Sequence, residues 1–299
     1  MKALSALAVA AILAALSGTA AATEIETARG PVEIAAPPKR IAVFDIPAID
    51  TLSSLGVEIS GTPDNLFLPE LKEVADKALT VGTLFEPDLE ALSALGPDLI
   101  IVGARTSAQF DSVARIAPTI DMTLSGADMT AEARANILAY GKLFAREEAA
   151  RKRVAEFDQA VERARIAMKG KGNALIVMTS GAKISIYGPE SRFGWLHRDL
   201  GLPPAAETAV SAPHGEAVSF EFVREANPDW LIVLDRAAAI GSGEDNARAT
   251  LDNELVASTT AWRKQQVVYL PAADFYIGAG GVDATIRVLD ALANAFSEE

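Results

Sequence analysis

Three arginines occupy positions from which a β-sheet would present them to a ligand. Arg105 and Arg236 each follow an apolar run that predicts a buried strand, and Arg192 lies in a turn after a third such run. Ligands of open α/β sheets bind beyond the carboxyl ends of the strands, so we expect these side chains to face one crevice. A guanidinium keeps its charge and donates forked hydrogen bonds, which suits an oxygen-rich anion. Each arginine alone could be a surface ion-pair partner, but the three together predict a basic pocket.

Two further candidates lie in loops that contain glycine. His214 precedes Gly215, and Tyr276 precedes a glycine-rich segment. A single loop histidine is usually inert, and a tyrosine beside such a loop can simply pack against its neighbours. The other histidine, His197, lies at helical spacing among apolar residues, which indicates a structural role.

Glu90 and Glu221 belong to a pattern that occurs twice. The pattern runs from Glu90 to Arg105 and again from Glu221 to Arg236. In each copy, seven residues separate the Glu from an Asp, which is followed by four apolar residues, two further residues and the Arg. A helix–turn–strand unit repeated in one register is typical of a duplicated fold. Each glutamate alone would be interpreted as a solvated surface residue.

The motifs of common enzymes do not occur in the sequence. Gly278–Gly281 matches neither a dinucleotide-binding nor a phosphate-binding loop, and there is no Gly-x-Ser-x-Gly elbow or two-histidine zinc motif. A secreted α/β hydrolase with His214 as its base stays an alternative, although no serine partner is evident. We predict a protein that is not an enzyme and has no catalytic cofactor.

Apolar runs alternate with helical segments, which predicts an α/β fold with largely parallel sheets. One of the predicted strands is a short one at 57–61. From Glu147 to Lys169 there is no Gly or Pro, and apolar residues recur at spacings of three and four, which predicts one long helix. The sequence therefore predicts two Rossmann-like α/β lobes joined by a single long helix. The expected segments are an N-terminal extension (23–38), a first lobe (39–145), the connecting helix (146–170) and a second lobe (171–299).

Composition restricts the partners and the compartment. With 50% hydrophobic residues the chain can form large cores, and a formal net charge of −13 disfavours nucleic-acid binding. The absence of cysteine excludes disulfides, thiolate metal sites and a lipid-modified cysteine. Lys2, an apolar run from Ala3 to Leu16 and small residues up to Ala22 predict a signal peptide of residues 1–22; a membrane anchor, the alternative, would need a longer run. We expect an unanchored periplasmic protein that acts as a monomer.

Five segments resemble, in the same order, the periplasmic ferric-siderophore-binding proteins of ABC importers. The Ser-Arg-Phe-Gly and His-Gly segments are the most specific, and the resemblance covers essentially the whole mature chain. The catecholate binders, which include the ferric enterobactin and petrobactin types, are the branch that it indicates. The segments are Gly103–Arg105, Gly188–Gly194, His214–Gly215, Asp235–Arg236 and Phe275–Tyr276.

The resemblance implies a fold of two α/β lobes bridged by one long helix, with a ferric catecholate siderophore as the ligand. It implies that Arg105, Arg192 and Arg236 hold the negatively charged complex. It further implies that His214 and Tyr276 complete the iron shell when the siderophore supplies only four donor oxygens.

The resemblance also implies a partner, an inner-membrane ABC permease whose arginines would meet Glu90 and Glu221, one on each lobe. The alternatives keep the fold and change the ligand to haem, a corrinoid or a ferric hydroxamate. Hydroxamate complexes carry less negative charge and would need fewer arginines.

Overall fold

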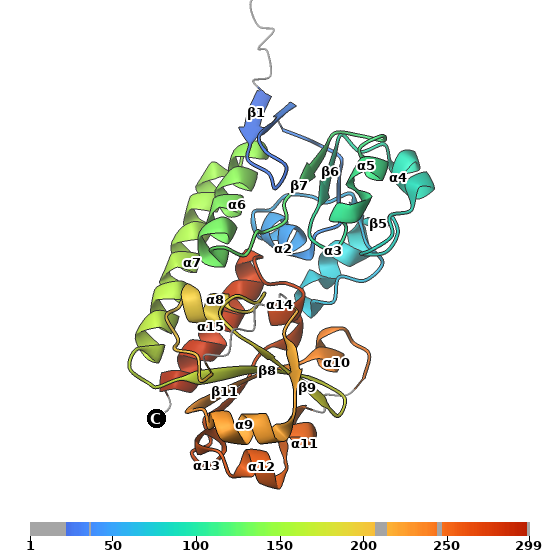
Figure 1. Cartoon of the computed structure of the whole chain (residues 1–299). Coiled ribbons are helices and arrows are strands. Elements are labelled where there is room, and N and C mark those ends of the chain that lie inside the picture. Colours follow the sequence, from blue (N-terminus) through green and yellow to red (C-terminus); the bar gives the residue numbers. More distant parts are fainter. Residues whose placement is uncertain (1–21, 36, 207–213, 244–246, 298–299) are drawn as a thin grey trace, which may run out of the picture.

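The computed structural model describes residues 22–35, 37–206, 214–243 and 247–297, which form two α/β halves with a layer of helices along one side (Figure 1). This architecture confirms the predicted α/β class. Residues 1–21 of the predicted signal peptide lie outside the described residues, and Ala22 begins the first strand. In this described part of the chain, no helix is long and apolar enough to cross a membrane.

The first half is built on a five-stranded parallel sheet with the strand order β5-β4-β3-β6-β7. Strands β3 and β6 are buried throughout, as expected for a parallel sheet that is covered on both faces. The strands are β3 (Ile41–Val43), β4 (Gly61–Thr62), β5 (Leu79–Thr80), β6 (Leu99–Val102) and β7 (Thr119–Asp121). The helices are α2 (Ile46–Ser54), η1 (Pro69–Leu71), α3 (Lys72–Lys77), α4 (Leu89–Leu95), η2 (Ser107–Gln109) and α5 (Phe110–Val113).

The prediction of a strand at 57–61 is wrong for its first four residues. Only Gly61, together with Thr62, pairs in the sheet, as β4. The backbone N–H of Val57 still donates to the carbonyl of Leu52 at the end of α2, at 3.0 Å. The residues that follow the helix are therefore used to close its C-terminus rather than to extend the sheet.

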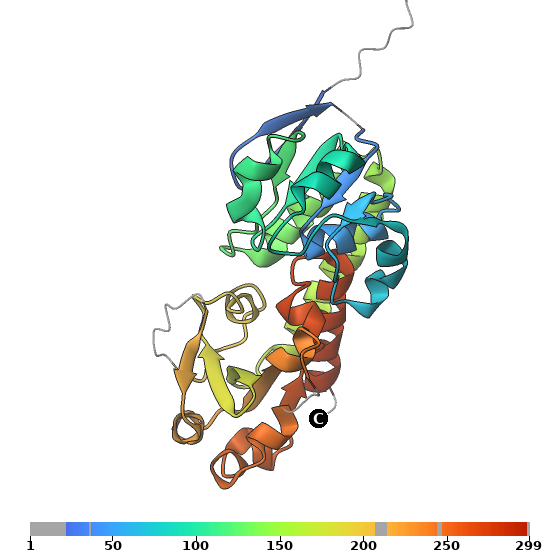
Figure 2. The same ribbon diagram turned by 90° about the vertical axis from the view of Figure 1, so that its right-hand side faces the viewer.

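The helical layer contains three long helices, α6 (Met129–Leu143), α7 (Glu147–Met168) and α15 (Val282–Ser297). The chain passes from the first sheet to the second through α6 and α7. The predicted apolar stripe of α7 is buried at Val154, Phe157, Val161, Ala164 and Met168. Helix α7 packs against both α6 and α15, and α15 also contacts α2 of the first half. Figure 2 shows α15 reaching from the second half into the first. The predicted domain boundaries stay predictions.

The second half contains a mixed five-stranded sheet, order β10-β9-β8-β11-β12. The prediction of largely parallel strands is wrong for β9 and β10, which run antiparallel to their neighbours. A tight turn containing Gly181 (φ +59°) reverses the chain between β8 and β9. The strands are β8 (Ala174–Ser180), β9 (Lys183–Tyr187), β10 (Glu216–Val218), β11 (Trp230–Asp235) and β12 (Val267–Tyr269). The helices are α8 (Trp195–Arg198), α9 (Phe220–Ala226), α10 (Arg236–Ala239), α11 (Ala247–Leu251), α12 (Glu254–Ala257), α13 (Thr260–Arg263) and α14 (Ala272–Tyr276).

The repeated sequence pattern folds into the same unit in both halves, α4–β6 and α9–β11. Each helix has seven residues and ends at a residue in the left-handed region, Gly96 or Asn227. The aspartate that follows the turn then accepts backbone hydrogen bonds from the segment entering the neighbouring strand. Asp98 accepts from the N–H of Lys39 and Arg40, and Asp229 accepts from that of Asn173. The unit thus joins a helix to two adjacent strands.

A hairpin of β1 (Ala22–Ile25) and β2 (Val32–Ala35) precedes the first sheet and remains separate from it. It lies within the segment predicted only as an N-terminal extension. Ile25 and Ile34 are buried in the main core, so the hairpin is an integral part of the first half.

Candidate functional site

The main-chain carbonyl of Tyr276 is the meeting point of two of the predicted arginines. Arg105 comes from the turn after β6 in the first half, and its Nη2 donates to the Tyr276 oxygen at 2.8 Å. Arg192 comes from the loop after β9 in the second half, and its Nη2 donates to the same oxygen at 3.0 Å. Two cations from opposite halves therefore share one neutral acceptor, located at the end of α14.

Arg236, the third arginine, lies at the side chain of the same tyrosine. It is the first residue of α10, directly after β11, and its guanidinium is within hydrogen-bonding reach of the Tyr276 phenol. Burial alone would raise the pKa of Tyr276, but Arg236 and the charges of Arg192 and Arg105 lower that pKa below its ordinary value. The structure thus brings all three arginines and Tyr276 together.

The arginines have no ion-pair partner among the described residues. Burial and the nearby charge of Arg192 lower the pKa of Arg105, while Asp45 acts in the opposite direction. Asp45 lies between β3 and α2 and caps that helix by accepting from the N–H of Ala48. Burial raises the pKa of Asp45 to about 6, although Arg105 lowers it in turn. The positive charge of the site therefore exceeds the negative charge that the protein places beside it.

A glycine of the Gly103–Arg105 segment is needed for this packing. A Cβ atom on Gly103 would lie 1.9 Å from the Asp45 carboxylate, so no other residue fits without displacing that group. Gly103 therefore lets the turn that carries Arg105 approach α2 closely.

Aromatic rings form a rigid support under the arginines. Phe193 stacks on Phe275 with centroids 4.5 Å apart and meets the edge of Tyr187 at 4.7 Å. The Arg192 guanidinium lies over the Phe193 and Tyr276 rings, 4.8 and 4.7 Å from their centroids. Cation–π contacts of this kind hold a guanidinium in place while leaving its N–H donors available.

His214 lies near this cluster but not in it. The side chain is exposed, and the structure records no contact between it and Tyr276. The next residue, Gly215 (φ +77°), packs so closely on Tyr187 that a Cβ atom there would lie 2.6 Å from its ring. Tyr187 in turn is close enough to Arg192, Tyr276 and Arg236 for their charges to act on it. His214 is thus at the correct end of the second sheet, while its role as an iron ligand stays a prediction.

Glu90 and Glu221 are exposed in the first turns of α4 and α9. The carboxylate of Glu221 accepts hydrogen bonds from Ser219 and from its own backbone, which lowers its pKa. Both glutamates are therefore presented at equivalent places on the two halves.

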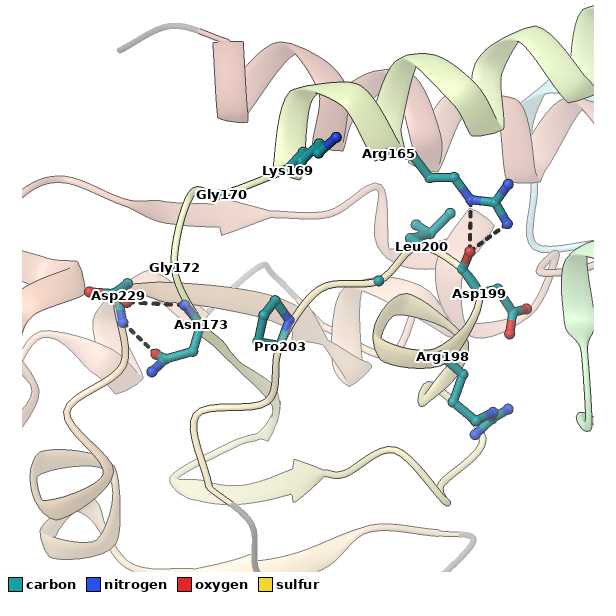
Figure 3. A pocket seen from close by; sticks show the side chains of 11 residues that line it. Arg165, Lys169, Gly170, Gly172, Asn173, Arg198, Asp199, Leu200, Pro203 and Asp229 are labelled. Atoms are coloured by element: carbon teal, nitrogen blue, oxygen red, sulfur yellow. Dashed lines mark hydrogen bonds between the residues drawn. The ribbon is translucent and has the colours of Figure 1, made fainter.

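A hollow beside the second sheet does not include the three arginines. It has a volume of about 780 Å³ and lies beside the end of α7 (Figure 3), where Arg165 already donates to the carbonyl of Asp199 at 2.8 and 2.6 Å. Asp229 and Asn173, also in this hollow, bond to each other. The polar groups of Arg165, Asn173 and Asp229 in this hollow are therefore already engaged. In the described part of the chain, no three His, Asp or Glu side chains gather as metal ligands.

Sequence reasoning missed Asp45 and Tyr187 as members of the site. Asp45 ends the apolar run that begins at Ile41, at the same sheet edge as Arg105, and this position was a usable signal. Tyr187 immediately precedes the Gly188–Gly194 segment, but its contact with Gly215 joins loops far apart in sequence and could not be inferred from spacing.

The charge environment of Tyr276 can be measured directly. We expect Tyr276 to ionise at lower pH than Tyr140 and Tyr187, whose pKa values burial raises. Arg236→Gln should move the Tyr276 step to higher pH, because it removes a hydrogen bond and a positive charge. The absorbance of tyrosinate during alkaline titration measures this, and Tyr276→Phe assigns the step. Arg248→Gln, which removes a guanidinium 4.0 Å from the Tyr269 ring, is the control and should leave the step in place. An unchanged titration in Arg236→Gln would contradict the proposed contact.

The chain is similar to known proteins over most of its length, not only at the site. A family model described as periplasmic binding protein matches residues 41–273. The petrobactin-binding protein YclQ of Bacillus subtilis is 33% identical over 258 residues, covering 84% of this chain and 80% of that protein. The ferric-anguibactin-binding protein FatB of Vibrio anguillarum is 30% identical over 274 residues, covering 89% of this chain and 85% of that protein.

Solved structures agree with these relatives. The crystal structure of YclQ is similar with a TM-score of 0.87 at 30% identity, covering 93% of this chain and 100% of that one. The periplasmic catecholate-siderophore-binding protein VctP of Vibrio cholerae has a TM-score of 0.83 at 32% identity, covering 91% and 99%. With a family match over most of its length and relatives of this similarity, the chain belongs to the periplasmic binding protein family.

Proposed function

We propose that this protein captures a ferric siderophore of the catecholate class in the periplasm and delivers it to an inner-membrane ABC permease. The observation that carries the proposal is the convergence of Arg105, Arg192 and Arg236 on Tyr276 without a carboxylate ion pair among the described residues. Three catecholates on Fe(III) leave a net charge of −3, which three guanidinium groups can neutralise. The protein acts as a monomer and performs no covalent chemistry on its ligand.

The chemistry of the donors favours an oxygen-rich anion over a neutral ligand. Guanidinium groups retain their charge when water is excluded and donate paired hydrogen bonds to anionic oxygens. Burying such charges without a counter-charge is costly, so an anion that replaces the shared carbonyl gains a large electrostatic contribution. The names of YclQ, FatB and VctP, all of which refer to siderophores or to a ferric complex, support this ligand class.

Haem, a corrinoid or a ferric hydroxamate are the alternative ligands on the same fold. The iron(3+)-hydroxamate-binding protein FhuD of Bacillus subtilis is also a relative, at 26% identity. The hydrolase alternative has little support, because His214 is exposed and no serine partner contacts it in the described residues. Quenching of tryptophan fluorescence during titration with ferric catecholate, ferric hydroxamate and haem distinguishes the ligands.

Replacing Arg105, Arg192 or Arg236 by alanine should weaken ferric catecholate binding more than neutral ferric hydroxamate binding. Loss of one charge-assisted contact costs about 1.5–3 kcal/mol, or about 10- to 150-fold in Kd. Lysine should restore only part of the loss, because the forked geometry is missing. Equal losses for both ligand classes would contradict charge matching.

Glu90 and Glu221 are proposed to dock on the permease. Their equivalent places on the repeated units put one carboxylate on each half, as a two-sided interaction with basic groups requires. The double substitution of both glutamates to arginine should leave siderophore affinity in solution unchanged and abolish import into cells. Glu225, exposed near the other end of α9, offers the control Glu225→Arg, which should import normally. Normal uptake by the double variant would contradict the docking role.

His214 and Tyr276 are proposed to bind iron directly when the siderophore leaves two coordination positions vacant. Fe(III) prefers hard oxygen donors, and the lowered pKa of Tyr276 favours the phenolate form. His214 is followed by Gly215, which packs on Tyr187 beside Tyr276, so the histidine lies at the same end of the second sheet as the phenol.

The substitutions His214→Ala and Tyr276→Phe should therefore impair two-catecholate complexes far more than three-catecholate complexes, which already fill six positions. Binding of a two-catecholate complex should also produce a phenolate–iron charge-transfer band that is absent in Tyr276→Phe. Identical visible spectra in the two proteins would exclude ligation by Tyr276.

A further inference from the structure

The N-terminal hairpin holds Arg29 in a defined position. Ile25 and Ile34, which are 2% and 5% exposed, anchor its two strands in the main core. The turn between them is fixed by its own contacts, since the Thr27 hydroxyl donates to the Gly30 carbonyl at 2.6 Å and the N–H of Arg29 donates to the Thr27 hydroxyl at 3.1 Å. The backbone at Arg29 is therefore set independently of its side chain.

The Arg29 side chain makes three contacts with the first half. Its Nε donates to Oδ2 of Asp121 at 3.1 Å, and its Nη2 donates to the carbonyl of Ser107 at 3.2 Å. The guanidinium also lies 4.0 Å from the centroid of the Phe110 ring. One side chain thus joins the end of β7 to η2 and to the start of α5.

Asp121 is the centre of this network. Its side chain is only 3% exposed, whereas that of Arg29 is 44% exposed. Oδ2 accepts from the Ser107 hydroxyl at 2.5 Å, and Oδ1 accepts from the hydroxyl and N–H of Thr123 at 2.5 and 3.1 Å. Burial would raise the pKa of Asp121, but these hydrogen bonds and Arg29 lower it. Removing Arg29 leaves this buried carboxylate without its one charged partner in the described structure.

Ser107 belongs to the turn that carries Arg105. The carbonyl of Gly103 accepts from the N–H groups of Thr106 and Ser107 at 2.9 and 2.8 Å, so the turn is tight. The Thr106 hydroxyl is buried and donates to the carbonyl of Leu84 at 2.6 Å. Thr106 thus fixes one side of the turn, and Ser107 connects the other side to Asp121 and Arg29. Because Ser107 and Arg105 belong to one tight turn, we expect a displacement of Ser107 to shift Arg105.

We propose that Arg29 is a positioning residue for ligand binding, which acts through Asp121 and Ser107 to fix the turn that presents Arg105 to the siderophore. The inference rests on the proposed function for its ligand, but the mechanical link can be tested without one. The hairpin then has a role in the site although none of its residues contacts the three arginines.

The first test measures ferric catecholate affinity in the whole mature protein. Arg29→Gln should raise Kd by about 5- to 10-fold, the effect of a misplaced rather than missing donor. Arg29→Lys should restore only part, because one ammonium cannot reach Asp121, Ser107 and the ring together. Arg134→Gln is the matched control, because Arg134 pairs with Asp158 through the same Nε–Oδ2 geometry at 3.1 Å, but between helices α6 and α7. An equal loss in the control would overturn the proposal.

The second test asks whether Arg29 acts through Arg105. In the Arg105→Ala background, Arg29→Gln should cause no further loss of affinity, since the group it positions is gone. Fully additive losses would overturn the proposal.

The third test needs no ligand. Hydrogen exchange of the Thr106, Ser107 and Gln109 amides, which bond within the turn, should accelerate in Arg29→Gln and not in Arg134→Gln. Unchanged exchange in Arg29→Gln would overturn the proposal. If instead the wild-type protein fails to bind any ferric catecholate while exchange accelerates as expected, the proposed function fails and the positioning role stands.

Discussion

Repulsion among three guanidinium groups is the constraint on which the rest of this structure depends. Arg105 and Arg192 donate to one carbonyl, and Arg236 lies at the phenol of the same residue, Tyr276. Like charges held this close remain together only if each is fixed by its own rigid element. The protein supplies a partial counter-charge in Asp45 and cation–π contacts over its aromatic rings. The remaining positive charge is what a trianionic ligand would neutralise.

The fold meets this constraint by placing each arginine after the carboxyl end of a strand, β6, β9 or β11. The repeated units α4–β6 and α9–β11 present Arg105 and Arg236 from opposite halves. In both units an aspartate, Asp98 or Asp229, bonds to the segment that enters the neighbouring strand. The layer of α6, α7 and α15 holds the two halves together. Since α15 follows the loop after Tyr276 and packs on both α7 and α2, the tyrosine is fixed relative to both halves.

Much of this could be predicted from the sequence, and the failures have physical reasons. The positions of Arg105 and Arg236 could be predicted because a buried apolar run with an arginine shortly after it is a local pattern in the sequence. Arg105 and Arg192 share the main-chain carbonyl of Tyr276 as acceptor. Every residue has such a carbonyl, so the sequence cannot indicate which one is used. The antiparallel β9 follows a tight turn at Gly181, a local feature that a reading of alternating strands and helices overlooks. The proposed role of the hairpin depends on a contact between Arg29 and Asp121, which lie 92 residues apart and meet only in the folded chain.

The most direct measurement is the affinity of the wild-type protein for a series of ferric complexes that share six oxygen donors and a similar size but differ in net charge from 0 to −3. If charge neutralisation at the three arginines drives binding, Kd should fall by about tenfold or more with each added negative charge, since one charge-assisted contact contributes about 1.5–3 kcal/mol. The differences should shrink as salt screens the approach of the anion. A Kd that stays the same across the series at low salt would contradict the account.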